Sequence, residues 1–144
     1  MPLRPDGAFV FRTKTWFDQT DALGILHHSH YVLLIERAQK TFFVEVMGVD
    51  TIDPEVAPDV YVVVRDLELH YLAAIRPECE VDIILRVTRV RAAGLTVDFE
   101  FRSLDGSVLY CRGSRTICRM DGRMHQPAPW TDLFRQKHEA LIAR

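Results

Sequence analysis

Three stretches of alternating apolar and polar residues, separated by short turns, make up most of the second half of this sequence. Residues 80–91 and 95–101 flank the turn 92–94, and residues 107–120 follow the turn 104–106. A period of two places alternate side chains on one face of a β-strand, and turns this short join antiparallel neighbours. The pattern predicts an antiparallel sheet with one apolar face, which another part of the chain must cover.

A single long helix is predicted to cover that face. From Tyr31 to Met47 apolar residues recur at spacings of three and four, and Gly48 stands where a helix normally ends. Ser29 is a candidate N-cap. Because apolar residues also occupy part of the opposite face, we expect most of this helix to be enclosed.

The remaining segments complete an α+β domain. Residues 8–17 and 60–71 are predicted strands, and the alternation of the second slips around Arg65, as it does at a β-bulge. The order of one strand, a helix and four strands favours one antiparallel sheet packed on one helix. We assign residues 1–125 to this domain and residues 126–144 to a C-terminal tail, with a short amphipathic helix that covers a sheet edge or a partner.

Length, charge and cysteine usage exclude several classes of protein. The 144 residues suit a single domain, and the hydrophobic and charged fractions, 48% and 26%, are ordinary for globular proteins. A net charge of -2 gives no field that attracts nucleic acid. The three cysteines lack CxxC spacing, and no stretch resembles a signal peptide or a membrane span. We therefore expect a cytoplasmic protein that binds neither nucleic acid nor membranes.

The loop between the first strand and the helix carries the residues best suited to chemistry. Asp21, Gly24, His28 and Tyr31 follow the spacing D-x-x-G-x-x-x-H-x-x-Y, which places a carboxylate just before a helix N-terminus. The unpaired N–H groups of such a terminus hold a carbonyl oxygen as it becomes an oxyanion, while the carboxylate of Asp21 activates water or attacks directly. Gly24 lets the backbone approach a substrate closely.

These residues also have a purely structural interpretation. Taken alone, Asp21 is better explained as a residue that caps the loop or the helix. The catalytic interpretation depends on all four motif residues occurring together at this spacing. His27, His28 and His30 suggest a metal, but adjacent histidines point apart along a turning chain, so no metal site is predicted. The sequence also lacks the motifs of serine hydrolases, P-loop enzymes, dinucleotide enzymes and zincins.

The stretch Phe17–Tyr31, followed by Ile35-Glu36-Arg37-Ala38, resembles the signature of hot-dog-fold acyl-CoA thioesterases. The likeness is to the 4-hydroxybenzoyl-CoA thioesterase family, including its Tol-Pal-associated short-chain acyl-CoA members, and the order of elements agrees over residues 1–125. It implies a hot-dog fold, in which an antiparallel sheet wraps around one long central helix. It also implies a homo-oligomer, either a dimer or a homotetramer assembled from dimers. The active site would lie between subunits.

The resemblance further implies an enzyme that hydrolyses aliphatic or aromatic acyl-CoA to the free acid and coenzyme A. Asp21 matches the catalytic carboxylate, as general base or nucleophile, and His28 the residue whose backbone N–H polarises the thioester carbonyl. No cofactor is implied, since coenzyme A is part of the substrate. Two alternatives stay open: a thioesterase that acts on acyl carrier protein thioesters, and a non-catalytic protein that binds acyl thioesters. A third rival is another hot-dog enzyme, a hydratase or dehydratase, whose own histidine-containing helix signature has no clear match here.

Four further residues are expected to contact the substrate. Gly24 and Tyr31 belong to the signature itself, and Glu36 lies further along the same helix. Arg91, at the end of a predicted strand, resembles a basic residue that meets the phosphates of coenzyme A. For Glu36 the competing interpretation is an ion pair with Lys40, one helical turn away.

Overall fold

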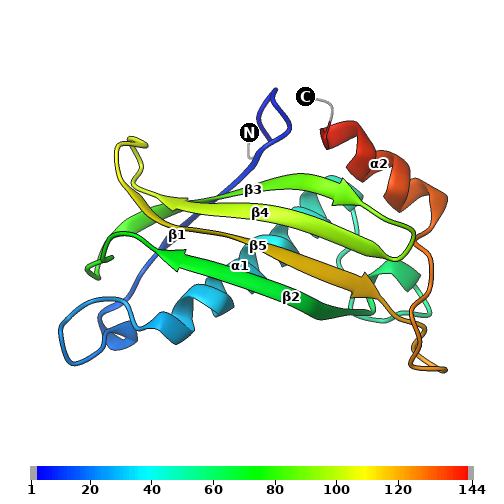
Figure 1. Cartoon of the computed structure of the whole chain (residues 1–144), viewed down its shortest axis with the longest axis horizontal. Helices are drawn as coiled ribbons and strands as arrows, with labels where there is room; N and C mark the ends of the chain where they lie inside the picture. The colour runs from blue at the N-terminus through cyan, green and yellow to red at the C-terminus, as the bar shows by residue number, and fades with distance from the viewer. Residues whose placement is uncertain (1–2, 143–144) are drawn as a thin grey trace.

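The computed structural model describes residues 3–142 and confirms the predicted α+β architecture (Figure 1). The five strands form one antiparallel sheet in the order β1-β3-β4-β5-β2. The strands are β1 (Phe9–Lys14), β2 (Val62–Tyr71), β3 (Glu80–Val90), β4 (Gly94–Arg102) and β5 (Leu109–Arg119). The α-helices in the described residues are α1 (His28–Phe42) and α2 (Asp132–Ile142). No helix within residues 3–142 combines the length and apolarity needed to cross a membrane.

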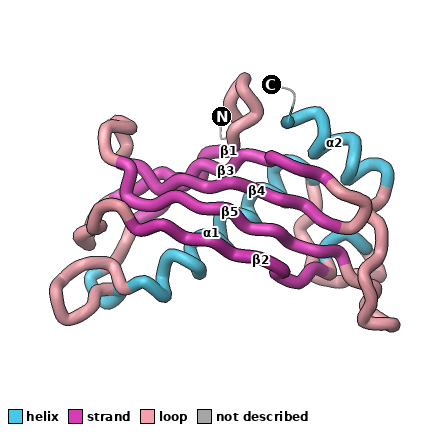
Figure 2. The backbone as a smooth tube through the Cα atoms, in the orientation of Figure 1, coloured by secondary structure: helices cyan, strands magenta, loops and turns pink. Residues whose placement is uncertain are grey.

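The helix α1 lies behind the sheet and packs on its apolar face (Figure 2). It continues through a π-helical turn at Phe43–Met47 and ends at Gly48, whose φ of 68° is the left-handed conformation expected of a C-terminal glycine. The predicted N-cap Ser29 is wrong. The cap is His27, whose Nδ1 accepts the Ser29 N–H at 3.2 Å, because the chain is already helical at residue 28.

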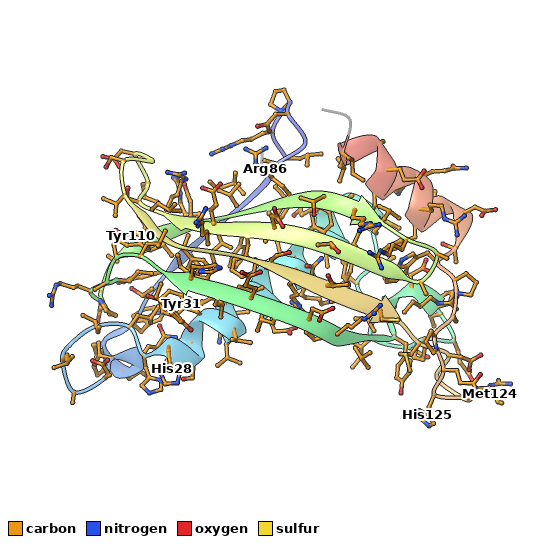
Figure 3. All side chains as sticks on the ribbon, in the orientation of Figure 1. His28, Tyr31, Arg86, Tyr110, Met124 and His125 are labelled. Atoms are coloured by element: carbon orange, nitrogen blue, oxygen red, sulfur yellow. The ribbon has the colours of Figure 1, made fainter. Side chains whose placement is uncertain are left out.

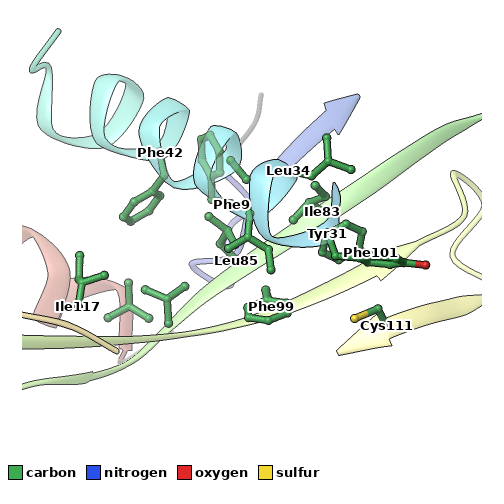
Figure 4. Close-up of a cluster of buried hydrophobic side chains, with 14 of the residues drawn as sticks. Phe9, Tyr31, Leu34, Phe42, Ile83, Leu85, Phe99, Phe101, Cys111 and Ile117 are labelled. Carbon is green, nitrogen blue, oxygen red and sulfur yellow. The ribbon is translucent and has the colours of Figure 1, made fainter. Parts of the chain in front are cut away.

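The core consists of the inner face of the sheet and the buried side of α1 (Figure 4). The alternating residues predicted to point inward on β3 are indeed buried, and Phe99 and Phe101 on β4 complete the layer against Leu34 and Phe42 of α1. The opposite side of α1 is less enclosed than expected, because one sheet covers one face only. Leu33, for example, remains 51% exposed.

Two irregularities of the sheet follow from its edges. The ladder between β2 and β5 shifts register between Val64 and Asp66, which confirms the bulge predicted at Arg65. Asp82 on β3 is charged and yet buried. The reason is the edge strand β1, from which Arg12 donates two hydrogen bonds, of 2.9 and 3.1 Å, to the Asp82 carboxylate.

The C-terminal segment forms the predicted amphipathic helix, and α2 packs against β3 at one end of the sheet (Figure 1). Trp130, Phe134 and Leu141 belong to the same cluster of buried residues as α1 and the sheet. The Trp130 indole Nε1–H donates to the Gly94 carbonyl at 3.1 Å, which ties the segment to the turn between β3 and β4. The segment after residue 125 therefore covers a part of the core.

Candidate active site

A pocket of about 330 Å³ opens at the N-terminal end of α1. The signature loop forms one side of it, and the chain that follows β2 forms the other. Figure 3 labels His28 and Tyr31 at this end of the helix, below the end of β2. The lining residues are Asp21, Ile25, Leu26, His28, Tyr31, Tyr71, Leu72, Ala73 and Ala74. The pocket therefore brings together three of the four signature residues, Asp21, His28 and Tyr31.

The carboxylate of Asp21 organises the loop and still has an unoccupied oxygen. Its Oδ1 accepts the Leu23 N–H at 2.8 Å and the Ile25 N–H at 3.4 Å, closing a turn in which Gly24 has a φ of 76°. Its Oδ2 receives no hydrogen bond from residues 3–142. The structural and the catalytic interpretations of Asp21 thus describe different oxygens of one side chain. Gly24 supplies the left-handed turn between Asp21 and the start of the helix.

The first turn of α1 leaves one backbone donor available. His27 satisfies the Ser29 N–H through its ring Nδ1 and the His30 N–H through its carbonyl, at 3.0 Å. The backbone N–H of His28, the first residue of α1, has no hydrogen-bond acceptor in the described part of the chain. An unpaired N–H at the positive end of a helix is a suitable donor for a developing oxyanion.

The far wall of the pocket is aromatic. The Tyr31 ring meets the Tyr71 ring edge to face, with centroids 5.0 Å apart, and also contacts Phe101. Burial raises the pKa of Tyr31 to about 12 and also raises the pKa of Tyr71, so both phenols are neutral near pH 7. Burial likewise raises the pKa of the nearby Cys111 to about 11, which keeps this thiol protonated and unreactive.

Three of the four predicted substrate contacts do not line this pocket: Gly24, in the turn beside it, and the more distant Glu36 and Arg91. Glu36 pairs with Arg115, whose Nη2 lies 2.8 Å from its Oε1, whereas the proposed partner Lys40 pairs with Asp50. Arg91 sits in the turn after β3, and its N–H donates to Gly94. An 11-residue strand spans roughly 35 Å, which holds Arg91 far from the opposite end of β3, where the signature loop lies.

The second side of the pocket could not be located from the sequence. Tyr71 and Leu72–Ala74 reach the signature loop because β2 runs past the start of α1, and the Leu26 N–H donates to Ile75 at 2.8 Å just beyond. Alternation identified β2 as a strand but carried no information on which loop its end would meet. The clearest signal in the sequence for this side of the pocket was Tyr71, at the end of the predicted strand 60–71.

Histidines cluster at the pocket without forming a metal centre. The rings of His27 and His28 lie 4.1 Å apart, centroid to centroid, and those of His27 and His30 lie 6.5 Å apart. Among residues 3–142 no group of three or more His, Cys, Asp or Glu side chains is placed to hold a metal ion.

The sheet packed on one central helix has the hot-dog architecture, and the comparisons identify the class of protein. The thioesterase superfamily model matches residues 23–110, more than half of the chain, so this protein belongs to that superfamily and is an enzyme of thioester hydrolysis. The matched range begins two residues after Asp21. A comparison with curated protein sequences finds no match.

Solved structures confirm the fold. The DHNA-CoA thioesterase from Staphylococcus aureus superposes with a TM-score of 0.80 at 17% identity, covering 94% of this chain and 91% of that one. A thioesterase from Thermus thermophilus, complexed with coenzyme A and Zn, gives 0.77 at 21% identity, covering 94% and 95%. The 1,4-dihydroxy-2-naphthoyl-CoA thioesterase from Synechocystis gives 0.76 at 13% identity, covering 94% and 96%. At such identities the likeness is one of fold.

Proposed function

We propose that this thioesterase hydrolyses acyl thioesters of coenzyme A in the pocket that Asp21, His28 and Tyr31 share. One observation carries the proposal: a carboxylate with an unoccupied oxygen and a helix with an unpaired first N–H line the same pocket of about 330 Å³. Base-assisted attack on a carbonyl requires a base within reach of the attacking water and a donor within reach of the carbonyl oxygen.

In the general-base route, Oδ2 of Asp21 removes a proton from water as the water oxygen attacks the thioester carbonyl carbon. Negative charge develops on the carbonyl oxygen, which accepts the His28 backbone N–H. The tetrahedral intermediate then breaks its C–S bond, and the departing thiolate takes the proton from Asp21. The products are the free acid and the thiol of coenzyme A.

In the nucleophilic route, Oδ2 of Asp21 attacks the same carbon and expels the thiolate, which forms a mixed anhydride. Water then hydrolyses the anhydride and returns the carboxylate. Both routes need the same oxyanion donor, so the His28 N–H serves either one. Neither route needs a cofactor, and coenzyme A enters only as part of the substrate.

The pocket wall favours an apolar acyl group beside the reacting carbon. Ile25, Leu26 and the two tyrosine rings present apolar or aromatic surface, and Ala73 and Ala74 leave room beside them. Coenzyme A as the thiol part of the substrate is supported by two structural neighbours that were solved in complex with it, from Staphylococcus aureus and Thermus thermophilus. A cytoplasmic location stays a prediction.

A homodimer or tetramer of dimers is part of this proposal. β2 is an edge strand and exposes apolar side chains at Val63, Val64 and Leu67 before it ends at Tyr71 in the pocket. An open edge with apolar residues is a surface for strand pairing with a second copy. Such pairing would bring a neighbouring subunit to the pocket, and Arg91 would meet coenzyme A only if another subunit supplied it.

The deciding experiment measures thiol release from short, long, branched and aromatic acyl-CoA esters, beside the same acyl groups on an acyl carrier protein. We expect the enzyme to hydrolyse the coenzyme A esters at least tenfold faster than the carrier-protein esters. A reversed ratio would assign the carrier protein as donor. Saturable acyl-CoA binding without thiol release would instead select the non-catalytic binding protein.

A further inference from the structure

A second pocket, of about 140 Å³, lies between the middle of α1 and the strands β2 and β5. Its wall is largely apolar and includes Phe43, Val62 and Ile117, with Ile52 at the rim. Ile52 is 86% exposed, which places it at the opening of the pocket. None of the residues that line this pocket lines the pocket of Asp21.

The polar part of this wall contains a buried and incompletely paired arginine. The Arg115 side chain is only 6% exposed and forms one ion pair, from Nη2 to Glu36. Its Nε and Nη1, and the amide Nε2 of the adjacent wall residue Gln39, are buried without a hydrogen-bond partner among residues 3–142. Buried donors are nearly always paired in folded proteins, so three free ones in one wall indicate an acceptor that comes from outside the chain.

The charges of the wall indicate whether the acceptor group carries a negative charge. Glu36 contributes one negative charge, while Arg115 and Lys40 contribute two positive charges. Lys40 is paired with Asp50, whose carboxylate is 82% exposed and is not part of the wall. The wall therefore carries one positive charge in excess, which a single negative charge on a ligand would balance.

We infer that this second pocket binds a small apolar carboxylate. The ligand oxygens accept hydrogen bonds from the free donors of Arg115 and from the Gln39 amide, and the apolar body contacts Phe43, Val62 and Ile117. The free donors are buried, so this contact requires the end groups of Arg115 and Gln39 to rotate toward the ligand. The inference is independent of the proposed catalytic site, although free acids from thioester hydrolysis belong to the same chemical class.

Calorimetric titration of the wild-type protein with hexanoate and benzoate, and with hexanamide and benzamide, tests the chemistry. The amides have nearly the shape of the acids but no charge. We expect each carboxylate to bind at least tenfold more tightly than its amide. Equal affinities, or no carboxylate binding at millimolar concentration, would overturn the inference.

Three variants assign the binding to this pocket. Ile52→Glu adds a negative charge at the exposed rim and is expected to weaken carboxylate binding at least fivefold, while the uncharged Ile52→Gln, of the same shape as the glutamate, binds as the wild type does. Replacing both ion-pair partners, Glu36→Gln with Arg115→Met, avoids leaving a lone buried charge and is expected to abolish the preference for acid over amide. Carboxylate binding that survives both changes would place the ligand outside this pocket and refute the inference.

Discussion

The imidazole of His138 on α2 stacks on the ring of Phe134 one turn earlier, with ring centroids 3.9 Å apart. The ring is fully buried, its Nδ1 lies 2.7 Å from the Phe134 carbonyl oxygen, and its Nε2 has no partner among the described residues. Burial lowers the pKa of His138 to about 4, because the charged imidazolium would lose its hydration. The docking of α2 therefore depends on a neutral histidine.

This relationship predicts a loss of stability in mild acid. The folded-state pKa lies below the unfolded value of 6.5, so the unfolded chain binds more protons, and stability falls as pH drops from 6.5 towards 4. At pH 5 the loss relative to neutral pH is about 2 kcal/mol from this group. Urea unfolding at pH 7 and pH 5 measures it, with His138→Phe as the variant that lacks the titration. The same pH dependence in both proteins would contradict the prediction.

Asp21→Asn is expected to lower kcat about 10²–10⁴-fold with little change in fold, because the amide Oδ1 still accepts the Leu23 N–H but Oδ2 is lost as a base or nucleophile. Asp18→Asn, an exposed carboxylate in the same loop, is the control and should keep wild-type turnover. Steady-state thiol release with the best acyl-CoA ester provides the measurement. Wild-type turnover by Asp21→Asn would remove Asp21 from the mechanism.

His28→Pro separates the backbone of His28 from its side chain. Proline is well tolerated at the first helical position, and His27 already has the extended conformation, φ -66° and ψ 139°, that a residue before proline prefers. The variant loses only the N–H and the ring, so kcat should fall about 10²–10³-fold. His28→Ala keeps the N–H and should stay within about threefold of wild type. Equal losses in the two variants would show that the imidazole matters and the backbone donor does not.

Gly113→Ala should destabilise the fold by roughly 2–3 kcal/mol. A Cβ at this position of β5 would overlap the Glu68 carbonyl oxygen and lie 2.6 Å from the Phe99 ring, so the β2–β5 ladder has no room for it. Gly94→Ala is the matched control, since its Cβ meets only ordinary contacts at 3.8 Å. Chemical denaturation gives both values. Equal stability of the two variants would argue against the close packing of β2 on β5.

Leu67→Lys tests the edge strand β2 as the proposed subunit contact. Sedimentation velocity should give a dimer or tetramer for the wild type and a shift towards monomer for the variant, because lysine on an open edge opposes strand pairing. Turnover should fall together with the assembly. Val56→Lys, at a residue 72% exposed in the connector before β2, should leave both unchanged. A monomeric wild type would contradict a site between subunits.

The outcome of the sequence predictions depends on how far apart the interacting residues lie. The end of the helix at Gly48, the bulge at Arg65 and the three alternating strands depend on backbone conformation and periodicity within a few residues, and all are confirmed. The N-cap differed by two residues because several side chains near a helix start compete for the same N–H groups.

The sequence by itself determined the order of elements and the composition of the signature loop, because both depend on neighbours along the chain. Tertiary structure alone decided which distant groups share a pocket. The path of β2 past the start of α1 brings Tyr71 and Ala74 into the pocket of Asp21, and the packing of α1 on β5 pairs Glu36 with Arg115. The length of β3 holds Arg91 at the far end. Local periodicity predicts which face of an element a residue occupies. Contact between distant residues also depends on the twist and register of several strands together.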